Sequence, residues 1–582
     1  MSSPKNAPLL SLRSVVFSYD GTRRVLDGIS LDVRPGERVA VLGHNGSGKS
    51  TLVRILGALQ APLQGACFIS GRDVREIPFE ELHAKVGVVF QNPESQIVAA
   101  VVEDDVAFAP ENQGLPPSEI EERVAWALER VGMAHKRSFP VSALSGGEKQ
   151  RVALAGALAS KAECFILDEP TAMLDPEGRL EVAGVLRAIH ESGTALVQVT
   201  HQLECLEDAD RILVLSKGRW LWQGDARDFW PDAERLGFEL PPLRRLAARL
   251  GARGVSVPSP TVEGVTSAVA ARLPGRSASS PPPADRPSIP ELPALLEVRD
   301  LSFRFDAPSP ETPLILDGVD ALFPRGAWTA VVGRTGSGKS TLVQHLNGLY
   351  KVQSGRILIE GSPLPQAGED LHRLRRRVGL VFQTPEDQLF CPTVREELSF
   401  APANAGFEDE RLEQAVRSAI SDVGLNDDFL LRNPLALSGG ERRLVAIVSV
   451  LAADPECLIL DEPTAGLDAA YRRRILCLLS DLRRCGRTVI TITHDLEMAF
   501  GCCDRLLVMD SGRTVGEGGV GTALPLLMQA LSSPVWPEVL QVSDRLRARC
   551  GSVPLTWNPD MLLRAIIYNV SYPIHIFFII YI

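Results

Sequence analysis

The chain has 582 residues, of which 45% are hydrophobic and 23% charged, so it is neither fibrous nor mainly disordered. Its 61 Lys and Arg residues are outnumbered by 72 Asp and Glu residues, and this net charge of −11 argues against nucleic acid as a partner. The ten scattered cysteines favour a reduced cytosol, and we expect neither a secretory signal nor a membrane-spanning stretch of about 18 apolar residues.

The sequence contains two copies of one unit. GHNGSGKST at 43–51 returns as GRTGSGKST at 333–341, and ALSGGE at 143–148 returns at 436–441. Other pairs follow in the same order, which indicates a duplicated unit far longer than a solenoid repeat. In chain order we expect a first domain at 1–240, a helical appendage and Pro/Ser-rich linker at 241–293, a second domain at 294–530, a helical segment at 531–564, and an atypical Ile/Tyr-rich tail at 565–582.

Two of these parts have no function that the sequence reveals. The helical appendage is expected to lie on the first copy, because it follows that copy directly. The tail, AIIYNVSYPIHIFFIIYI, is either a membrane-touching segment or an abnormal end of the chain, and we leave it out of the predicted fold.

Short apolar runs lead into the polar motifs of each copy. ERVAVLG and WTAVVG precede the glycine-rich loops, and CFILDE and CLILDE end in paired carboxylates. Apolar runs without alternation are typical of strands buried on both faces. The predicted fold class is therefore α/β, with a mostly parallel sheet covered by helices and with polar residues gathered at the ends of its strands.

The glycine-rich loops have the G-x-x-x-x-G-K-S pattern of a P-loop. Each follows a predicted strand and precedes a predicted helix, which is the context that phosphate binding requires. Lys49 and Lys339 are expected to reach the β- and γ-phosphates, and Ser50 and Ser340 to bind Mg²⁺. One such octamer can arise by chance, but two in matched positions do not.

Two further motifs have both a structural and a functional interpretation. S-G-G-E at 145–148 and 438–441 is a capping box that starts a helix, and its glycines also leave N–H groups open to an anion. The Asp-Glu pairs at 168–169 and 461–462 resemble solvated acidic turns when taken alone. Beside a P-loop, we expect the Asp to hold Mg²⁺ and the Glu to activate a water molecule.

Together, the P-loop, a glutamine after a strand, LSGG, the Asp-Glu pair, Leu-Asp and a terminal histidine resemble an ATP-binding cassette (ABC) ATPase. The resemblance covers most of both copies. It implies two tandem P-loop NTPase cassettes, each with a mostly parallel sheet, a helical subdomain and an antiparallel β edge. It also implies a pseudo-dimer within one chain, in which ATP and Mg²⁺ lie between the P-loop of one copy and the LSGG motif of the other.

The resemblance assigns residues to these sites by motif. In the first copy the nucleotide-binding residues are Tyr19, Gly43, Asn45, Gly46, Gly48, Lys49, Ser50, Thr51, Ser145, Gly146 and Gly147. In the second copy they are Phe305, Gly333, Thr335, Gly336, Gly338, Lys339, Ser340, Thr341, Ser438, Gly439 and Gly440. The catalytic residues are Gln91, Glu169, His201, Gln383, Glu462 and His494. The Mg²⁺ ligands are Ser50, Gln91, Asp168, Ser340, Gln383 and Asp461.

Some of these assignments have a competing interpretation. Tyr19 and Phe305 are placed to stack on adenine, but packing at a strand end is nearly as common for such aromatics. His201 and His494 are expected to contact the γ-phosphate rather than to fill the core. Asp175 and Asp468 occupy the family's D-loop position and are expected to communicate between the two sites.

The segments after the two glutamines indicate a partner. FQNPESQIVAAVVEDDVAFAPENQGLP and FQTPEDQLFCPTVREELSFAPANAG resemble the two ATPases of energy-coupling factor (ECF) transporters, including cobalt and nickel uptake relatives. By this resemblance the chain lies on the cytoplasmic face of the membrane. It binds a transmembrane coupling protein and a small substrate-binding membrane protein, and it drives import of a vitamin, a vitamin precursor or a metal ion.

Two other interpretations remain open. The same segments are compatible with ordinary helical packing inside a cassette. A soluble twin-cassette protein that acts on the ribosome, similar to the ABC-F factors, is the competing functional class. Those factors carry a long charged helical linker, whereas residues 272–293 are rich in Pro and Ser.

Overall fold

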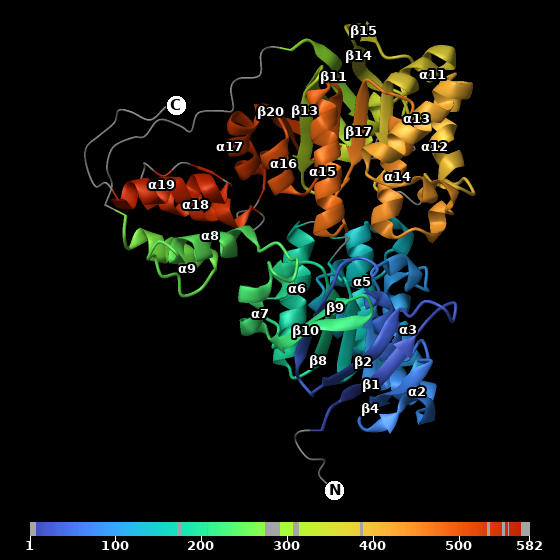
Figure 1. Ribbon diagram of the computed structural model, residues 1–582, viewed down its shortest axis with the longest axis vertical. Helices are drawn as coiled ribbons and strands as arrows, with labels where there is room; N and C mark the ends of the chain where they lie inside the picture. The colour runs from blue at the N-terminus through green and yellow to red at the C-terminus, as the bar shows by residue number, and fades with distance from the viewer. Residues whose placement is uncertain are drawn as a thin grey trace. The chain divides into compact units, whose positions relative to one another are not determined.

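The structure is a computed structural model that describes residues 7–571 except 172–173, 175, 207, 274–291, 306–312, 385–387, 532–535, 550–552, 554 and 557. The Pro/Ser-rich linker, Asp175 and the end of the tail lie outside the described residues. The chain forms two compact units, at 1–240 and 241–582. Figure 1 shows their helices and strands along the chain.

The first unit contains a six-stranded sheet in the order β10-β9-β3-β8-β7-β6. Its strands are β3 (Arg38–Leu42), β6 (Val86–Val89), β7 (Cys164–Asp168), β8 (Ala195–Thr200), β9 (Arg211–Ser216) and β10 (Arg219–Asp225). All neighbours pair in parallel except β9 and β10. Strands β3, β7 and β8 are buried along their whole length, which is why they read as continuous apolar runs.

A second, antiparallel sheet of the first unit has the order β2-β1-β4-β5. Its strands are β1 (Leu10–Phe17), β2 (Leu26–Val33), β4 (Gln64–Ile69) and β5 (Arg72–Asp73). Its apolar face shares a core with the inner strands of the larger sheet and with α1. The helices of this unit are α1 (Lys49–Leu56), α2 (Phe79–Lys85), α3 (Val102–Asn112), α4 (Pro117–Arg130), α5 (Gly146–Ala159), α6 (Pro176–Glu191) and α7 (Ala226–Asp232).

The second unit repeats this plan with sheet orders β12-β11-β14-β15 and β16-β17-β18-β13-β19-β20. Its strands are β11 (Ala294–Phe303), β12 (Leu316–Pro324), β13 (Trp328–Gly333), β14 (Ser354–Ile359), β15 (Ser362–Pro363), β16 (Val378–Val381), β17 (Cys457–Asp461), β18 (Thr488–Ile492), β19 (Arg505–Asp510) and β20 (Arg513–Gly519). Its cassette helices are α10 (Lys339–Leu346), α11 (Gly368–Arg377), α12 (Val394–Asn404), α13 (Asp409–Asp422), α14 (Gly439–Leu451), α15 (Ala469–Arg484), α16 (Leu496–Cys502) and α17 (Val520–Ala530). The predicted fold class is confirmed in both copies.

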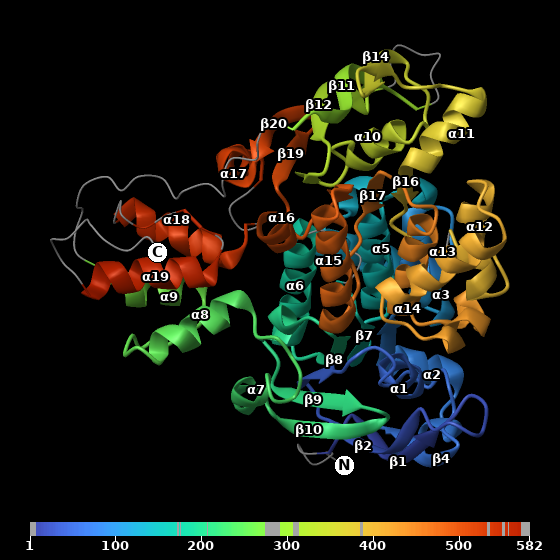
Figure 2. The same cartoon turned by 45° about the horizontal axis from the view of Figure 1, so that its top comes forward.

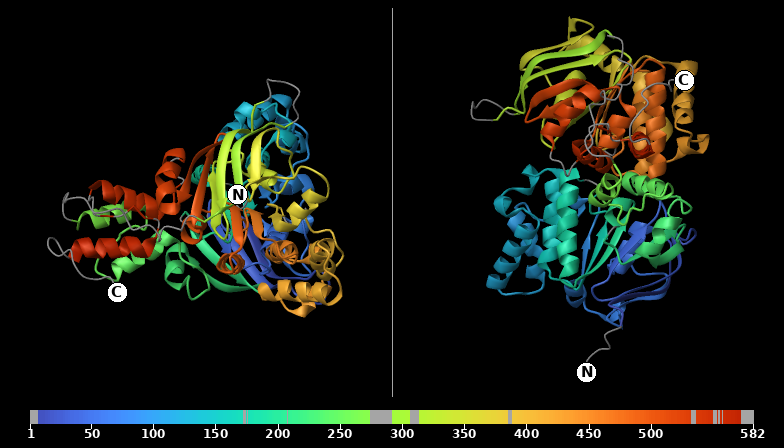
Figure 3. Two further views of the ribbon diagram at one scale, coloured as in Figure 1. Left: turned by 90° about the horizontal axis from the view of Figure 1, so that it is seen from above. Right: turned by 90° about the vertical axis from the view of Figure 1, so that its left-hand side faces the viewer.

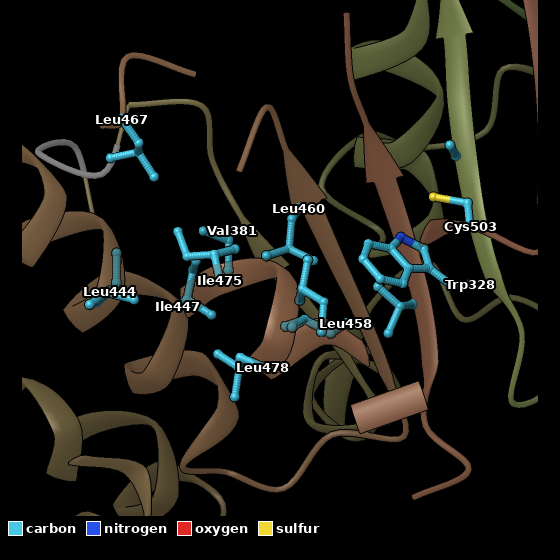
Figure 4. Close-up of a cluster of buried hydrophobic side chains, with 14 of the residues drawn as sticks. Trp328, Val381, Leu444, Ile447, Leu458, Leu460, Leu467, Ile475, Leu478 and Cys503 are labelled. Carbon is cyan, nitrogen blue, oxygen red and sulfur yellow. The ribbon is translucent and has the colours of Figure 1, made fainter. Parts of the chain in front are cut away.

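The central strands of the second unit pack against its helices through one large core. Leu458 and Leu460 of β17 lie in the same cluster as Ile447 of α14 and Ile475 of α15, as Figure 4 shows. The buried Trp328 indole donates a hydrogen bond to Thr491 Oγ1 at 3.1 Å, so its polar atom is satisfied. This rigid core fixes the strand ends that carry the candidate site.

Four further helices form a separate small core within the second unit. These are α8 (Pro242–Gly251), α9 (Val262–Ala270), α18 (Glu538–Arg549) and α19 (Pro559–Ser571), whose apolar side chains share one cluster. In the left panel of Figure 3 the green and red helices lie side by side. The appendage therefore packs on the C-terminal helices, a contact that chain order did not predict. Residues 565–571, set aside as part of the tail, belong to α19, and Ile566 is buried in this core.

No helix among the described residues combines the length and the hydrophobicity that crossing a membrane requires.

Candidate functional site

Both P-loops have the geometry of a phosphate-binding loop. Gly48 and Gly338 precede α1 and α10 with φ values of 106° and 91°, a region that favours glycine. A Cβ atom at Gly48 would lie only 2.8 Å from the carbonyl oxygen of Val25, so no other residue fits there. Each loop therefore turns sharply into a helix whose first N–H groups point toward it.

The P-loop lysines are held by the loops themselves. Lys49 Nζ donates hydrogen bonds to the carbonyl oxygens of Gly43 at 2.8 Å and His44 at 3.2 Å. Lys339 Nζ donates equally to those of Gly333 at 3.0 Å and Arg334 at 2.7 Å. Both ammonium groups thus lie inside the cradle in which a phosphate chain would bind.

Buried hydroxyl groups line the same cradles. Ser47 Oγ and Ser337 Oγ are buried and have no hydrogen-bond partner among the described residues. Asn45 and Gly46 of the first loop correspond to Thr335 and Gly336 of the second. Buried polar atoms without partners are costly, and a phosphate oxygen would satisfy them.

In the first copy, the predicted carboxylates lie where β7 ends. Asp168 is buried, and this burial raises its pKa to about 6, opposed by a hydrogen bond from Ser50. Glu169 has a φ of 49°, which is rare for a residue with a side chain and is typical of functional sites. Its N–H donates to the carbonyl oxygen of Val199 at 2.9 Å, which fixes this conformation.

In the second copy, the same arrangement follows β17. Burial raises the pKa of Asp461, and a hydrogen bond from Ser340 opposes this. Burial, together with the negative charge of Asp461, raises the pKa of Glu462 to about 8. Glu462 also has a left-handed backbone, with φ 50°.

The predicted glutamine and histidine converge on Glu169 in the first copy. His201 Nδ1 lies 2.9 Å from Glu169 Oε1, and Gln91 Nε2 donates to Glu169 Oε2 at 3.3 Å. In the second copy, His494 Nε2 lies 3.5 Å from Glu462 Oε1. The structure therefore brings Gln91, Glu169 and His201 together in the first copy, and Glu462 and His494 together in the second.

An arginine that the sequence analysis did not assign to a site takes part in the second site. Arg443 of α14 donates hydrogen bonds to the carbonyl oxygens of both Glu462 and Gln383, the latter at 2.8 Å. Gln150 takes its place in the first copy and donates instead to the carbonyl oxygen of Phe90 at 3.4 Å. Only geometry reveals this link, because the arginine is separated from both partners in sequence.

The signature turns start α5 and α14, as predicted. Ser145 and Ser438 each accept a hydrogen bond from the backbone N–H of the glutamate three residues later, and both capping boxes are complete. Gly146 and Gly439 have open space where a Cβ atom would lie. A Cβ atom at Gly440 would clash with the ring of Tyr471 at 2.7 Å, whereas one at Gly147 would lie 3.4 Å from Leu174.

The two adenine-stacking candidates are exposed. The side chain of Tyr19 is 60% exposed, and its hydroxyl lies 3.1 Å from Thr51 Oγ1 at the start of α1. Phe305 is 41% exposed and packs edge-on against Phe303. Thr341, the counterpart of Thr51, is buried.

Asp468, the D-loop residue of the second copy, is the N-cap of α15. It accepts hydrogen bonds from the N–H groups of Ala470 at 3.1 Å and Tyr471 at 3.0 Å.

An aromatic contact distinguishes the first P-loop from the second. The imidazole of His44 stacks on the ring of Phe238, with centroids 5.3 Å apart and an angle of 8° between the rings. Phe238 is buried in the same apolar cluster as Phe229 of α7. The second P-loop has Arg334, which is exposed, at the position of His44.

The oxygen groups beside each P-loop fit a hard divalent cation. Ser50 and Asp168 in one copy, and Ser340 and Asp461 in the other, are within hydrogen-bonding reach of each other. Hydroxyl and carboxylate oxygens are ligands that Mg²⁺ prefers, and a cation would favour the ionised form of these buried Asp residues.

Comparison with known proteins agrees with this geometry. The family described as ABC transporter matches residues 26–172 and 316–465. A Methanosarcina acetivorans protein described as an ABC transporter ATP-binding protein is 34% identical over 94% of this chain and 95% of its own length. A Bifidobacterium longum protein with the same description is 38% identical over 92% of this chain and 69% of its own length. Among solved structures, cbiO1 from Clostridium perfringens, titled as part of the ABC transporter complex cbiONQ, is 34% identical over 40% of this chain and 91% of its own, with a TM-score of 0.37.

Proposed function

Because the chain belongs to the ABC transporter family and is an ATPase with two tandem cassettes, we propose that it drives an ECF-type importer in the cell membrane. In this proposal it binds a transmembrane coupling protein and a small substrate-binding membrane protein at the cytoplasmic face. The cargo is a vitamin, a vitamin precursor or a metal ion. The observation that carries the proposal is a matched pair of exposed apolar loops, one in each cassette.

In the first cassette, the loop lies between β6 and α3. Gln96 Oε1 accepts from the N–H of Phe90 at 3.1 Å, which ties the loop to the end of β6. The buried carboxylate of Asp105 accepts from the N–H groups of Val98 at 2.7 Å and Ala99 at 3.0 Å. The loop thus presents Val98, which is 63% exposed, in a fixed conformation.

The second cassette builds the same loop from different side chains. Gln388 Oε1 accepts from the N–H of Phe382 at 3.0 Å. The buried carboxylate of Glu397 accepts from the N–H groups of Phe390 at 3.0 Å and Cys391 at 2.9 Å. Phe390 is 64% exposed, and its ring meets that of the exposed Phe400 edge-on at 4.8 Å.

These loops support docking of an apolar partner. Buried carboxylates fix the backbones of both loops, so the exposed apolar side chains are presented in one conformation that a partner surface can cover. Gln91 and Gln383 lie at the start of the same segments, so a partner bound to the loops would be coupled to the nucleotide sites. This is the arrangement that an ATP-driven membrane transporter requires.

We propose two composite ATP sites, each with the P-loop of one cassette and the LSGG turn of the other. Lys49 and Lys339 bind the phosphates, and the N–H groups at Gly146, Gly147, Gly439 and Gly440 face the γ-phosphate from the opposite copy. Bound Mg²⁺ neutralises phosphate charge. The residues that would hold it are Asp168 and Asp461, the adjacent P-loop serines, and Gln91 and Gln383.

Glu169 and Glu462 act as general bases toward the attacking water. Each is held by a strained backbone at a strand end, which fixes its position before substrate binds. His201 lies against the base in the first site and keeps its carboxylate oriented. Closure on ATP and opening after hydrolysis form a two-state cycle that the loops transmit to the partner.

Substitution of Glu169 and Glu462 tests their proposed role as general bases. Glu169→Gln with Glu462→Gln should abolish ATP turnover while ATP binding persists, because glutamine keeps the shape but cannot accept the proton. ATPase assays and retention of labelled ATP measure the two properties. Unchanged turnover would exclude these residues as the bases.

A purification test addresses the partner. The chain, isolated from its native membranes in mild detergent, should carry integral membrane proteins with it. The paired variant Val98→Arg and Phe390→Arg should lose them and keep its ATPase activity within about twofold, since neither residue touches a nucleotide site. Leu221→Arg, at an exposed site on β10, is the matched control and should retain them. Recovery of ribosomes instead would favour the soluble ABC-F-like function.

A further inference from the structure

A tyrosine of the second cassette touches the signature turn that starts α14. Tyr471 lies in the first turn of α15, three residues after Asp468. Its ring packs against Gly440 so closely that a Cβ atom on this glycine would lie only 2.7 Å from the ring. Helices α14 and α15 lie side by side in Figure 2. The tyrosine thus joins the start of one helix to the start of the other.

The polar end of this tyrosine reaches the signature serine. The phenol hydroxyl of Tyr471 is within hydrogen-bonding reach of the Ser438 side chain. Ser438 Oγ donates its proton to Glu441 Oε2 at 2.8 Å and accepts from the N–H of Glu441 at 3.4 Å. Because a hydroxyl oxygen has two lone pairs, one of them is left for the phenol to donate to. Burial and the charge of Glu441 raise the pKa of Tyr471, so the phenol keeps its proton at neutral pH.

The backbone that carries the ring is fixed as well. The N–H of Tyr471 donates to Asp468 Oδ1 at 3.0 Å, and Asp468 is a buried N-cap. The ring also packs at the edge of the large core of the second cassette. A side chain that is held at its backbone, its ring and its hydroxyl restricts the movement of the turn that it touches.

The first cassette has Gly178 at the position of Tyr471. A glycine has no side chain, so it offers the first signature turn neither a ring nor a hydroxyl. A Cβ atom at Gly147, the counterpart of Gly440, would meet Leu174 at 3.4 Å. The two signature turns therefore share their capping boxes, but residue 471 supports the second turn in a way that residue 178 cannot support the first.

We propose that Tyr471 is a positioning residue of the first ATP site, which combines the P-loop of the first cassette with the second signature turn. This inference rests on the composite ATP sites proposed above. The phenol holds Ser438 and the N–H groups at Gly439 and Gly440 in the orientation that an anion requires. The turn is then ordered before ATP arrives, so less conformational freedom is lost on binding. Tyr471 therefore strengthens ATP binding at the first site and not at the second.

The test measures the two sites separately in the full chain. The photoreactive analogue 8-azido-ATP labels the protein near the bound base, and peptide mapping by mass spectrometry shows which cassette carries the label. Glu169→Gln with Glu462→Gln serves as the background, so that hydrolysis does not interfere. Tyr471→Phe should raise the half-saturating concentration for labelling of the first cassette about threefold to tenfold. The value for the second cassette should change by less than about twofold.

The phenylalanine variant separates positioning from packing, because its ring still fills the space beside Gly440. Tyr471→Ala should weaken labelling of the first cassette at least as much as Tyr471→Phe does. Cys477→Ala, at an exposed position of the same helix, is the matched control and should leave both cassettes unchanged.

Two results would overturn the proposal, and they differ in what they say about the composite sites. If Tyr471→Phe labels both cassettes like the background protein, the hydroxyl has no positioning role, whichever P-loop the turn serves. If Tyr471→Phe weakens labelling of the second cassette instead, the turn serves the P-loop of its own cassette. The composite ATP sites would then be wrong as well.

Discussion

Glu462 shows how strongly burial changes a single carboxyl group. Its pKa is raised from 4.5 to about 8, with loss of hydration as the main cause and Asp461 as the second. Between these two pH values the folded protein keeps a proton that the unfolded chain has lost. The free energy of unfolding therefore falls as the pH rises through this range.

Glu462→Gln removes this dependence on pH. The nucleotide-free variant should melt at a higher temperature than the unmodified protein, and the difference should be larger at pH 8 than at pH 5. A stabilisation on the order of a few kcal/mol at pH 8 corresponds to a shift of about 3 °C or more. Thermal melts at the two pH values measure it, with the exposed Glu410→Gln as control. An equal shift of the melting temperature at pH 5 and pH 8 would contradict the raised pKa of Glu462 as the cause.

Arg443 distinguishes the two nucleotide sites at the level of one side chain. It joins the backbone at Gln383 to that at Glu462, whereas Gln150 in the first copy donates to the carbonyl oxygen of Phe90. Hydrogen bonds from charged donors contribute about 1.5 to 3 kcal/mol each. The arginine thus holds the glutamine segment in place beside the general base.

Arg443→Gln should lower ATP turnover about threefold to tenfold and also lower the melting temperature, because two hydrogen bonds from a charged donor are lost. Arg443→Lys should recover part of the activity, because lysine keeps one charged donor. Steady-state ATPase assays measure the effect. Arg484→Gln, at an exposed position of α15, should have none. Full activity of Arg443→Gln would show that the link does not affect catalysis.

At the scale of elements, the apolar loops depend on the first turns of α3 and α12. Asp105 and Glu397 are buried carboxylates, each of which accepts two backbone N–H groups of the loop before it. Without them, four N–H groups would lose their partners and the loops would become mobile.

Asp105→Ala with Glu397→Ala should increase amide hydrogen exchange at Val98 and Phe390 at least tenfold. The same variant should lose its membrane partners and keep ATPase activity within about twofold. Asp105→Asn with Glu397→Gln should recover slow exchange, because an amide oxygen still accepts the bonds. If Asp105→Ala with Glu397→Ala exchanges faster but still binds its membrane partners, docking does not require loops of fixed conformation.

Local motifs were the features that the sequence predicted well. The P-loops, the capping boxes at Ser145 and Ser438 and the carboxylates at strand ends all depend on residues close together in sequence. The partner of α8 could not be predicted in this way. The buried face of a short amphipathic helix shows that something covers it, but not that the cover lies about 300 residues later. The link from Arg443 to Gln383 was missed for the same reason, because the two residues are 60 positions apart. Asp105 is only 7 positions from Val98, and its link was missed because the sequence does not show that this carboxylate is buried.

At the scale of the whole molecule, fusion fixes the ratio of two different cassettes at one to one. If both ATP sites form within one chain, specific ATPase activity should not depend on protein concentration. We expect a constant value from about 10 nM to about 10 µM, because the partner cassette has a high effective concentration. Loss of activity on dilution would show that the active form contains two chains.

The stacking of His44 on Phe238 has a mechanical consequence. Phe238 lies a few residues before α8 and stacks on His44 of the first P-loop. A displacement of α8 would therefore be transmitted to that P-loop. At the corresponding position of the second P-loop, Arg334 has no ring that could stack in this way. The two P-loops would therefore respond unequally to a displacement of α8, although their sequences are nearly the same.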